Sequence, residues 1–136
     1  MQPKILKKIA KLRQYIKLLK EYRPDCKERF NTDAMYEGAL LHYLYLVSDG
    51  CISLAEMTIK HNSLENPQSY YDAIDILGEH EIIPKQFAYE FAKIASFRNF
   101  LAHDYEKIDY LVICNDALAK LEEIEEYLQY IEKSIK

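Results

Sequence analysis

The chain has 136 residues, of which 49% are hydrophobic, with three glycines, four prolines and no tryptophan. This length fits one domain over residues 1–136, and the scarcity of Gly and Pro beside abundant Leu, Ile, Lys and Glu argues against a turn-rich β fold. The net charge of −4 argues against a non-specific nucleic-acid binder, which would neutralise phosphates with clustered Lys and Arg.

The first predicted element is an amphipathic helix over about 3–22. The segment Arg23-Pro24-Asp25 ends it, because the residue before a proline avoids helical geometry. Its apolar residues repeat by alternating steps of four and three, which is typical of a helix with one buried face: Ile5, Ile9, Leu12, Ile16 and Leu19.

A second helix is expected from Asp33 to about His61, with Thr32 or Asn31 as its N-cap. Its residues are apolar on nearly all sides. A helix of this kind is buried in a soluble protein. We therefore expect it to be the central helix of the core.

Two further helices follow a short loop. Ser69 begins the first of them, which runs through Leu77 and is stopped by Gly78 as a C-cap. Pro84 suits the first turn of the next helix, which continues to about Ala102. Both helices are shorter than the central one.

The last helix is amphipathic like the first. It follows the segment HDYEKID, and its apolar residues again repeat by fours and threes from Ala117 to Ile135. The first twenty residues hold lysine and arginine without one acid, whereas the last helix is rich in glutamate. We expect these two helices to lie side by side with complementary charges. The elements together predict an all-α, single-domain bundle of four to five helices.

The cysteines and the N-terminus bear on the cellular compartment. Cys26, Cys51 and Cys114 are an odd number with no CxxC spacing, so we interpret all three as ordinary thiols rather than a disulfide framework or a zinc site. Lysines interrupt the apolar residues of MQPKILKKIAKL, which therefore lacks a signal-peptide or membrane-spanning stretch. A soluble, cytoplasmic protein without a membrane partner is expected.

The residues that can carry chemistry gather at the end of the fourth predicted helix. Arg98, His103 and Tyr105 fall within eight residues, next to Asn99 and Asp104. An arginine donates forked hydrogen bonds to phosphate, and a histidine titrates near neutrality and can move a proton. If RNA supplies its own 2′-hydroxyl as nucleophile, His103 can act as general base or acid and Arg98 can stabilise the phosphorane, without a metal.

Helix geometry qualifies this hypothesis. Five residues along a regular helix turn through about 500°, which leaves Arg98 and His103 about 140° apart around the axis. Either the helix ends before His103 and the chain turns back, or a second copy contributes residues across a two-fold interface. From the residues alone, an Arg and a His at a helix end are more often surface and capping groups.

The segment RNFLAHDY, an Arg, four residues, a His, any residue and a Tyr, resembles the signature of the HepT-like branch of the HEPN superfamily. The resemblance extends from Asp33 to about Ile131 and includes DGCISLAE and FAYEFAKIASFRNFLAHDYEKID. It implies a HEPN-like homodimer with two composite active sites at the dimer interface. It also implies the toxin of a type VII toxin–antitoxin system, a metal-independent endoribonuclease that cleaves RNA and needs no cofactor.

The resemblance assigns roles to single residues. Arg98 and His103 would be catalytic. Asn99 and Asp104 match the polar filling of the motif. Asp49 sits where the branch often has an acid or amide on the central helix, and the site holds no metal.

The motif tyrosine would be the control point. In this branch a cognate minimal nucleotidyltransferase antitoxin transfers AMP to it, which corresponds to Tyr105. The chain departs from many relatives in having Leu41-His42 where they have a Glu-Arg pair. His42 can partly replace the missing charge, but a histidine beside Leu and Tyr is more often a packed or capping group.

Two other functions are compatible with the sequence. One is a non-catalytic HEPN scaffold that binds and supports a nucleotidyltransferase, and the other is a helical protein whose motif only stabilises a dimer by hydrogen bonds across the axis. The Arg98/His103 pair favours the nuclease, because a scaffold has no need of it. The tyrosines that can stack on unpaired bases are better explained by core and interface packing: Tyr43, Tyr45, Tyr70 and Tyr71.

Overall fold

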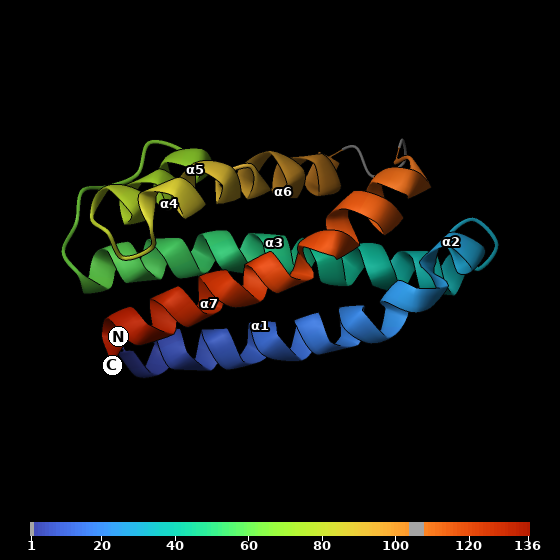
Figure 1. Cartoon of the computed structure of the whole chain (residues 1–136), viewed down its shortest axis with the longest axis horizontal. Helices are drawn as coiled ribbons and strands as arrows, with labels where there is room; N and C mark the ends of the chain where they lie inside the picture. Colours follow the sequence, from blue (N-terminus) through green and yellow to red (C-terminus); the bar gives the residue numbers. More distant parts are fainter. Residues whose placement is uncertain (1, 104–107) are drawn as a thin grey trace.

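The computed structural model describes residues 2–103 and 108–136, which form helices joined by turns and contain no strand. The all-α prediction is confirmed. In Figure 1 the long α3 runs through the middle of the bundle, α1 and α7 lie along one side of it, and α4, α5 and α6 lie along the other. The long elements are α1 (Gln2–Tyr22), α3 (Ala34–His61), α4 (Tyr70–Glu79), α5 (Lys85–Phe91), α6 (Ile94–His103) and α7 (Leu121–Ile135).

Helix α1 matches its prediction. The apolar stripe expected from the sequence is the face that α1 buries, and all five of its residues are at most 1% exposed. The chain leaves α1 at Tyr22 through a 3₁₀ turn, η1 (Arg23–Asp25), and a single α turn, α2 (Cys26–Arg29). Proline in the first turn of η1 explains why α1 ends there.

Helix α3 is the central helix, but its predicted cap is wrong. The N-cap is Asp33 rather than Thr32 or Asn31, and its carboxylate accepts a hydrogen bond from the backbone N–H of Tyr36 at 3.1 Å. Asp33 has the extended backbone that allows this contact. By length and composition α3 can cross a membrane, yet half of that apolar stretch is buried inside the bundle, so we interpret it as a core helix.

Helix α4 begins as predicted and ends later. The Ser69 hydroxyl caps it by accepting the N–H of Asp72 at 3.0 Å. Gly78 is not the C-cap: it lies inside the helix, which ends at Glu79 with His80 at the cap. A Cβ at Gly78 would lie 2.5 Å from the Cβ of Ala88, so the glycine permits α4 and α5 to pack closely.

The fourth predicted helix is in fact two helices, α5 and α6, that break at Ala92 and Lys93. Pro84 is the N-cap of α5 and not a residue of its first turn. Phe91 and Ala92 are both buried at the break, and the Phe91 ring stacks on Tyr127 with ring centroids 4.3 Å apart. The break lets α5 pack on α4 while α6 packs on α3.

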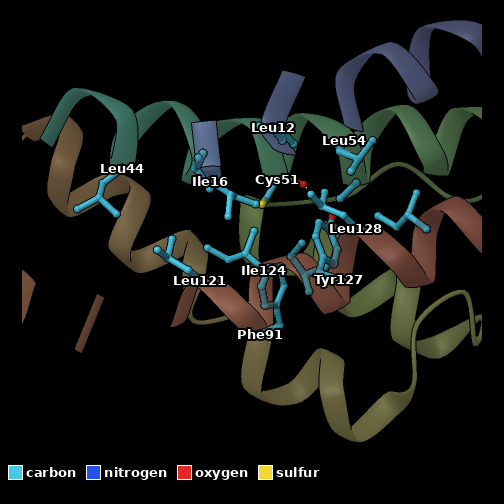
Figure 2. Packing of buried hydrophobic residues seen from close by; sticks show 14 of the residues in the cluster. Leu12, Ile16, Leu44, Cys51, Leu54, Phe91, Leu121, Ile124, Tyr127 and Leu128 are labelled. Atoms are coloured by element: carbon cyan, nitrogen blue, oxygen red, sulfur yellow. The ribbon is translucent and has the colours of Figure 1, made fainter. Parts of the chain in front are cut away.

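Helix α7 starts after the position that the apolar pattern predicts. A π-helical segment, η3 (Val112–Ala117), and a 3₁₀ turn, η4 (Leu118–Lys120), precede it. Figure 2 shows α7 side chains inserted into the core beside α3, where the Tyr127 hydroxyl donates to the backbone carbonyl of Cys51 at 2.7 Å. Burial raises the pKa of Tyr127 well above its ordinary value.

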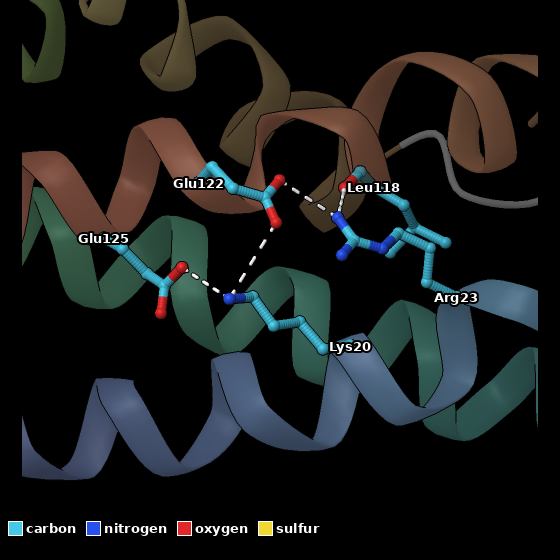
Figure 3. Close-up of polar contacts among 5 residues, drawn as sticks. All are labelled: Lys20, Arg23, Leu118, Glu122 and Glu125. Atoms are coloured by element: carbon cyan, nitrogen blue, oxygen red, sulfur yellow. Dashed lines mark hydrogen bonds and ion pairs between the residues drawn. The ribbon is translucent and has the colours of Figure 1, made fainter.

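The opposite charges of the first and last helices do meet, as predicted. Figure 3 shows Lys20 bridging Glu125 and Glu122, at 2.6 and 3.8 Å, and Arg23 contacting Glu122 at 3.0 Å. Nearer the termini, Arg13 pairs with Glu132 at 3.1 Å. We call this set of contacts the α1–α7 interface.

The cysteine prediction is wrong for two of the three residues. Cys26 and Cys114 form a disulfide across 88 residues of sequence, with their Cα atoms 5.6 Å apart, while Cys51 is free and buried. Cys26 follows α1 and Cys114 precedes α7, so the packing of those two helices brings the sulfurs together. Burial raises the pKa of the Cys51 thiol, which fits a packing role.

Candidate functional site

Arg98 is held between two helices by three hydrogen bonds. Its Nε donates to a carboxylate oxygen of Asp49 on α3 at 2.9 Å, and its two terminal nitrogens donate to the Tyr45 hydroxyl at 3.2 Å and the Asn99 side-chain oxygen at 3.1 Å. The Arg98 side chain is only 15% exposed. The structure thus brings together Arg98, Asn99 and Asp49, three of the predicted site residues.

Two tyrosine rings complete the surroundings of this guanidinium. Arg98 lies 5.4 Å from the ring centroid of Tyr45 and 4.9 Å from that of Tyr70, which begins α4. Aromatic faces attract a cation, so the rings help to orient it. From the sequence both tyrosines are expected to be packing residues, outside the predicted site. The available signal was the spacing of Tyr45, which lies one helical turn before Asp49.

The electrostatics keep Arg98 charged. Burial disfavours the charged form, but the hydrogen bond with Asp49 and the nearby acidic groups outweigh it and raise the pKa of Arg98. Asp49 has a half-exposed side chain, so this ion pair lies at the edge of the bundle. A fixed, partly desolvated guanidinium beside solvent can bind a phosphate group with defined geometry.

His103 is the last residue of α6 and is exposed. Because α6 continues through His103, the alternative in which the helix ends before this residue is wrong. Regular helix geometry therefore leaves Arg98 and His103 about 140° apart around the axis of α6. Asp104 and Tyr105, the remaining predicted residues of the motif, lie outside the described residues.

The two sides of the α3–α6 interface differ in chemistry. One side holds Arg98 with Asp49, Tyr45, Asn99 and Tyr70, which we call the Arg98 cluster. Asn99 and Tyr70 line a shallow depression there. We call this side the polar side. The other side is an apolar cavity of about 230 Å³, lined by Leu44 and Val47 of α3 and by Ile94 and Phe97 of α6, among others.

His42 is neither packed nor a cap, contrary to the interpretation favoured by the sequence. It is exposed in the interior of α3, with its ring 5.7 Å from that of Tyr43. It precedes Tyr45 by three residues and Asp49 by seven, so the three share one face of α3. Among the residues that the structure describes, no three His, Cys, Asp or Glu side chains group to hold a metal ion.

Known proteins resemble this chain over most of its length. The mRNA nuclease HepT of Shewanella oneidensis is 24% identical over 127 residues, which cover 93% of this chain and 95% of that protein. A solved structure of the tri-AMPylated HEPN toxin of Shewanella oneidensis in complex with MNT antitoxin matches with a TM-score of 0.83 at 23% identity, covering 95% of this chain and 96% of that one.

A second solved structure has a similar fold. YutE of Bacillus subtilis, a cytosolic protein of unknown function, matches with a TM-score of 0.73 at 20% identity, covering 98% of this chain and 87% of that one. The profile of the family described as Ribonuclease HepT-like matches residues 12–131. Since that match covers most of the chain, including α3, the Arg98 cluster and the greater part of α7, this chain belongs to the HepT-like ribonuclease family.

Proposed function

We propose that this protein is an RNA-cleaving toxin whose activity a partner nucleotidyltransferase switches off. The observation that carries the proposal is the environment of Arg98, a charged guanidinium fixed by Asp49 and Tyr45 at the edge of the bundle. A largely buried arginine has little value for stability, because its desolvation offsets the attraction of its partner. Binding of a substrate phosphate would account for an arginine at this position.

The reaction needs one anion-stabilising group and groups that move protons. The 2′-hydroxyl of RNA loses its proton and attacks the adjacent phosphorus, the bond to the 5′-oxygen breaks, and that oxygen takes up a proton. The products are a 2′,3′-cyclic phosphate and a free 5′-hydroxyl. Arg98 stabilises the charge on the phosphorane oxygens and His103 transfers a proton, so the chain's own residues suffice without a metal.

We infer that the working unit is a homodimer. Arg98 and His103 of one chain diverge around α6, so a second copy placed against the polar side brings another set of the same groups to the substrate. A two-fold axis there would create two composite sites in one cleft. Sedimentation tests this, and a monomer that retains cleavage at micromolar concentration would contradict the composite site.

The control residue in this proposal is Tyr105. The Shewanella toxin is tri-AMPylated in its complex with MNT antitoxin. AMP on Tyr105, two residues beyond His103, would bring a phosphate and a purine to the end of the site. The phosphate would compete with RNA for Arg98, and the purine would obstruct entry.

The decisive experiment is induced expression of the wild type beside Arg98→Ala and His103→Ala. Wild type should arrest growth and degrade RNA, and each variant should lose both effects while keeping its helical content and melting temperature. Purified wild type should cleave RNA equally with and without EDTA. Intact RNA during growth arrest by the wild type would overturn the proposal in favour of a scaffold that acts through its partner.

A second experiment tests the control step. Incubation with the cognate nucleotidyltransferase, ATP and magnesium should add one or more AMP masses at Tyr105 and stop cleavage. Tyr105→Phe should stay at least partly toxic and escape the mass change. Full neutralisation of Tyr105→Phe without any mass change would show that the partner inhibits by binding alone.

A further inference from the structure

The depression beside Arg98 lies where the start of α4 meets α6, two helices that pack side by side (Figure 1). Its lining combines two tyrosine rings with small side chains, most of them polar: Ser69, Tyr70, Tyr71, Ala95, Ser96 and Asn99. The first three are the N-cap and the first two residues of α4, and the other three belong to α6. The volume of the depression, about 380 Å³, is in the range of small-ligand sites.

The two tyrosine rings are exposed, although the sequence favours packing roles for them. Tyr70 is 38% and Tyr71 is 45% exposed. Arg98 lies over the Tyr70 ring, whereas no ring or cation among the described residues lies over Tyr71. Packing within one chain therefore does not account for Tyr71, and its ring is open to a ligand.

Tyr70 is the wall between this depression and the guanidinium of Arg98. The centre of the guanidinium is 4.9 Å from the centroid of the Tyr70 ring. The three hydrogen bonds that hold Arg98 leave N–H donors of the guanidinium unused, because it carries more donors than that. A phosphate bound to those donors would be separated from the depression by little more than one ring, so the sugar of a single nucleotide can join the two.

Asn99 gives the depression a directed polar edge. Its side-chain oxygen accepts a hydrogen bond from Arg98 at 3.1 Å, so its amide nitrogen is on the other branch of the side chain. Asn99 is exposed and lines the depression, and that N–H group can donate to an acceptor on the edge of a base. Aromatic faces for stacking and hydrogen bonds for a base edge are the means by which proteins hold unpaired bases.

We propose that the depression binds an unpaired base of the RNA, in a nucleotide next to the phosphate on Arg98, and that Tyr71 is a binding residue on which this base stacks. This rests on the proposed ribonuclease function and specifies its substrate class. A base inside a duplex is already stacked and paired, so the site favours cleavage in single-stranded segments.

Tyr71 is the residue to test, because Tyr70 also contacts Arg98. Tyr71→Leu keeps an apolar side chain without a flat face, and Tyr71→Phe keeps the ring. We expect kcat/KM for a single-stranded oligoribonucleotide to fall roughly tenfold in Tyr71→Leu, mainly through a higher KM, since stacking of one base contributes on this scale. Tyr71→Phe should cleave like wild type.

The matched control is Tyr89→Leu. Tyr89 is 63% exposed on α5 and does not line the depression, so this variant should cleave like wild type. Circular dichroism and sedimentation should be the same for all the proteins. A shift of Tyr71→Leu alone toward monomer would make Tyr71 a contact between two copies of the chain and would overturn the base site.

An abasic substrate separates stacking from a structural effect. When the base is removed from the nucleotide on one or the other side of the cut, one of the two substrates should be cleaved equally slowly by wild type and Tyr71→Leu, because it offers no base to stack. A tenfold deficit of Tyr71→Leu on both abasic substrates, or wild-type cleavage of intact RNA by Tyr71→Leu, would overturn the proposal.

A binding measurement tests the base site without cleavage. A short 2′-deoxy strand that contains the fluorescent base 2-aminopurine cannot be cut, and stacking quenches its fluorescence. Wild type and Tyr71→Phe should quench it at roughly tenfold lower protein concentration than Tyr71→Leu. Equal quenching by all three proteins would overturn the base site, whereas absence of RNA cleavage by wild type, with this difference in quenching retained, would overturn the ribonuclease function alone.

Discussion

The α3–α6 and α1–α7 interfaces both join two helices with ion pairs, yet the pairs differ in kind. At the α1–α7 interface, glutamates of α7 pair with basic side chains that are themselves 35–42% exposed: Arg13, Lys20 and Arg23. Arg98 meets Asp49 with its side chain 15% exposed and two aromatic rings beside it. Exposed pairs set the register of helices at little cost, whereas a partly desolvated arginine gives up more hydration, as the proposed binding of phosphate requires.

Because the α1–α7 interface lies apart from the Arg98 cluster, we expect changes near it to alter stability and leave cleavage intact. The largest such effect is expected from Cys114→Ser, which opens the link to Cys26. A cross-link spanning 88 residues restricts the unfolded chain, and its loss should cost about 2–4 kcal/mol of unfolding free energy.

Urea denaturation under oxidising conditions measures this loss. Adding a reductant should bring wild type to the level of the Cys114→Ser variant and should leave the variant unchanged. Cleavage of RNA well below the unfolding transition should be similar for both proteins. Equal stability of the oxidised proteins would show that the disulfide contributes nothing in solution.

At the α3–α6 interface we expect the reverse, a loss of cleavage with little loss of stability. Asp49→Asn keeps a side-chain oxygen for the Nε of Arg98 and removes the charge, so the guanidinium is held less firmly. Cleavage should fall roughly tenfold, with little change in melting temperature. The matched control is Glu132→Gln, which removes the carboxylate charge that pairs with Arg13. This variant should leave the cleavage rate unaltered. An equal effect of the two variants would break the comparison.

Periodicity is why the long helices could be predicted from the sequence. The stripe from Ile5 to Leu19 has one buried face and so leaves a 3.6-residue pattern. The break at Ala92 has no such mark, because the apolar pattern continues across it. It coincides with the stacking of Phe91 on Tyr127 and with the packing of α5 on α4 and of α6 on α3. Tertiary contacts between distant segments decide such features.

The same limit applies to the site. Arg98 and His103 could be proposed because they lie close together in one motif, and Asp49 because a family resemblance pointed to it. Tyr45 and Tyr70 reach Arg98 from two other helices. The spacing of Tyr45 from Asp49 was a signal for one of these contacts, but nothing in the neighbourhood of Tyr70 predicts the other. The Cys26–Cys114 link was missed for the same reason, since its partners are distant in sequence.

Tyr127→Phe tests the buried end of the α7 packing. The variant keeps the ring stacked on Phe91 and removes the hydroxyl that donates to the Cys51 carbonyl. One buried hydrogen bond should be lost, costing about 1 kcal/mol of unfolding free energy. Thermal denaturation with cleavage as a second readout checks this; a loss of cleavage at full stability would place α7 in the site.

The smallest expected effect on the unfolding free energy comes from removing an exposed ion pair, and this effect depends on pH. The hydrogen bond from Arg13 lowers the pKa of Glu132 below its ordinary value. A carboxylate whose pKa is lower in the folded state stabilises the protein above its unfolded pKa, near 4.3, and this contribution is lost as the pH falls through the folded pKa. Because the pair is partly exposed, Glu132→Gln should cost less than about 1 kcal/mol at neutral pH.

The pH dependence separates this electrostatic effect from a change in packing. The difference in unfolding free energy between wild type and Glu132→Gln should shrink as the solution is acidified below about pH 4, where the wild-type carboxylate also becomes neutral. High salt at neutral pH should reduce the same difference, since exposed charges are screened. A difference that persists in acid and in salt would mean that Glu132 acts through its packing, and the α1–α7 interface would then resemble the α3–α6 interface more than its exposure suggests.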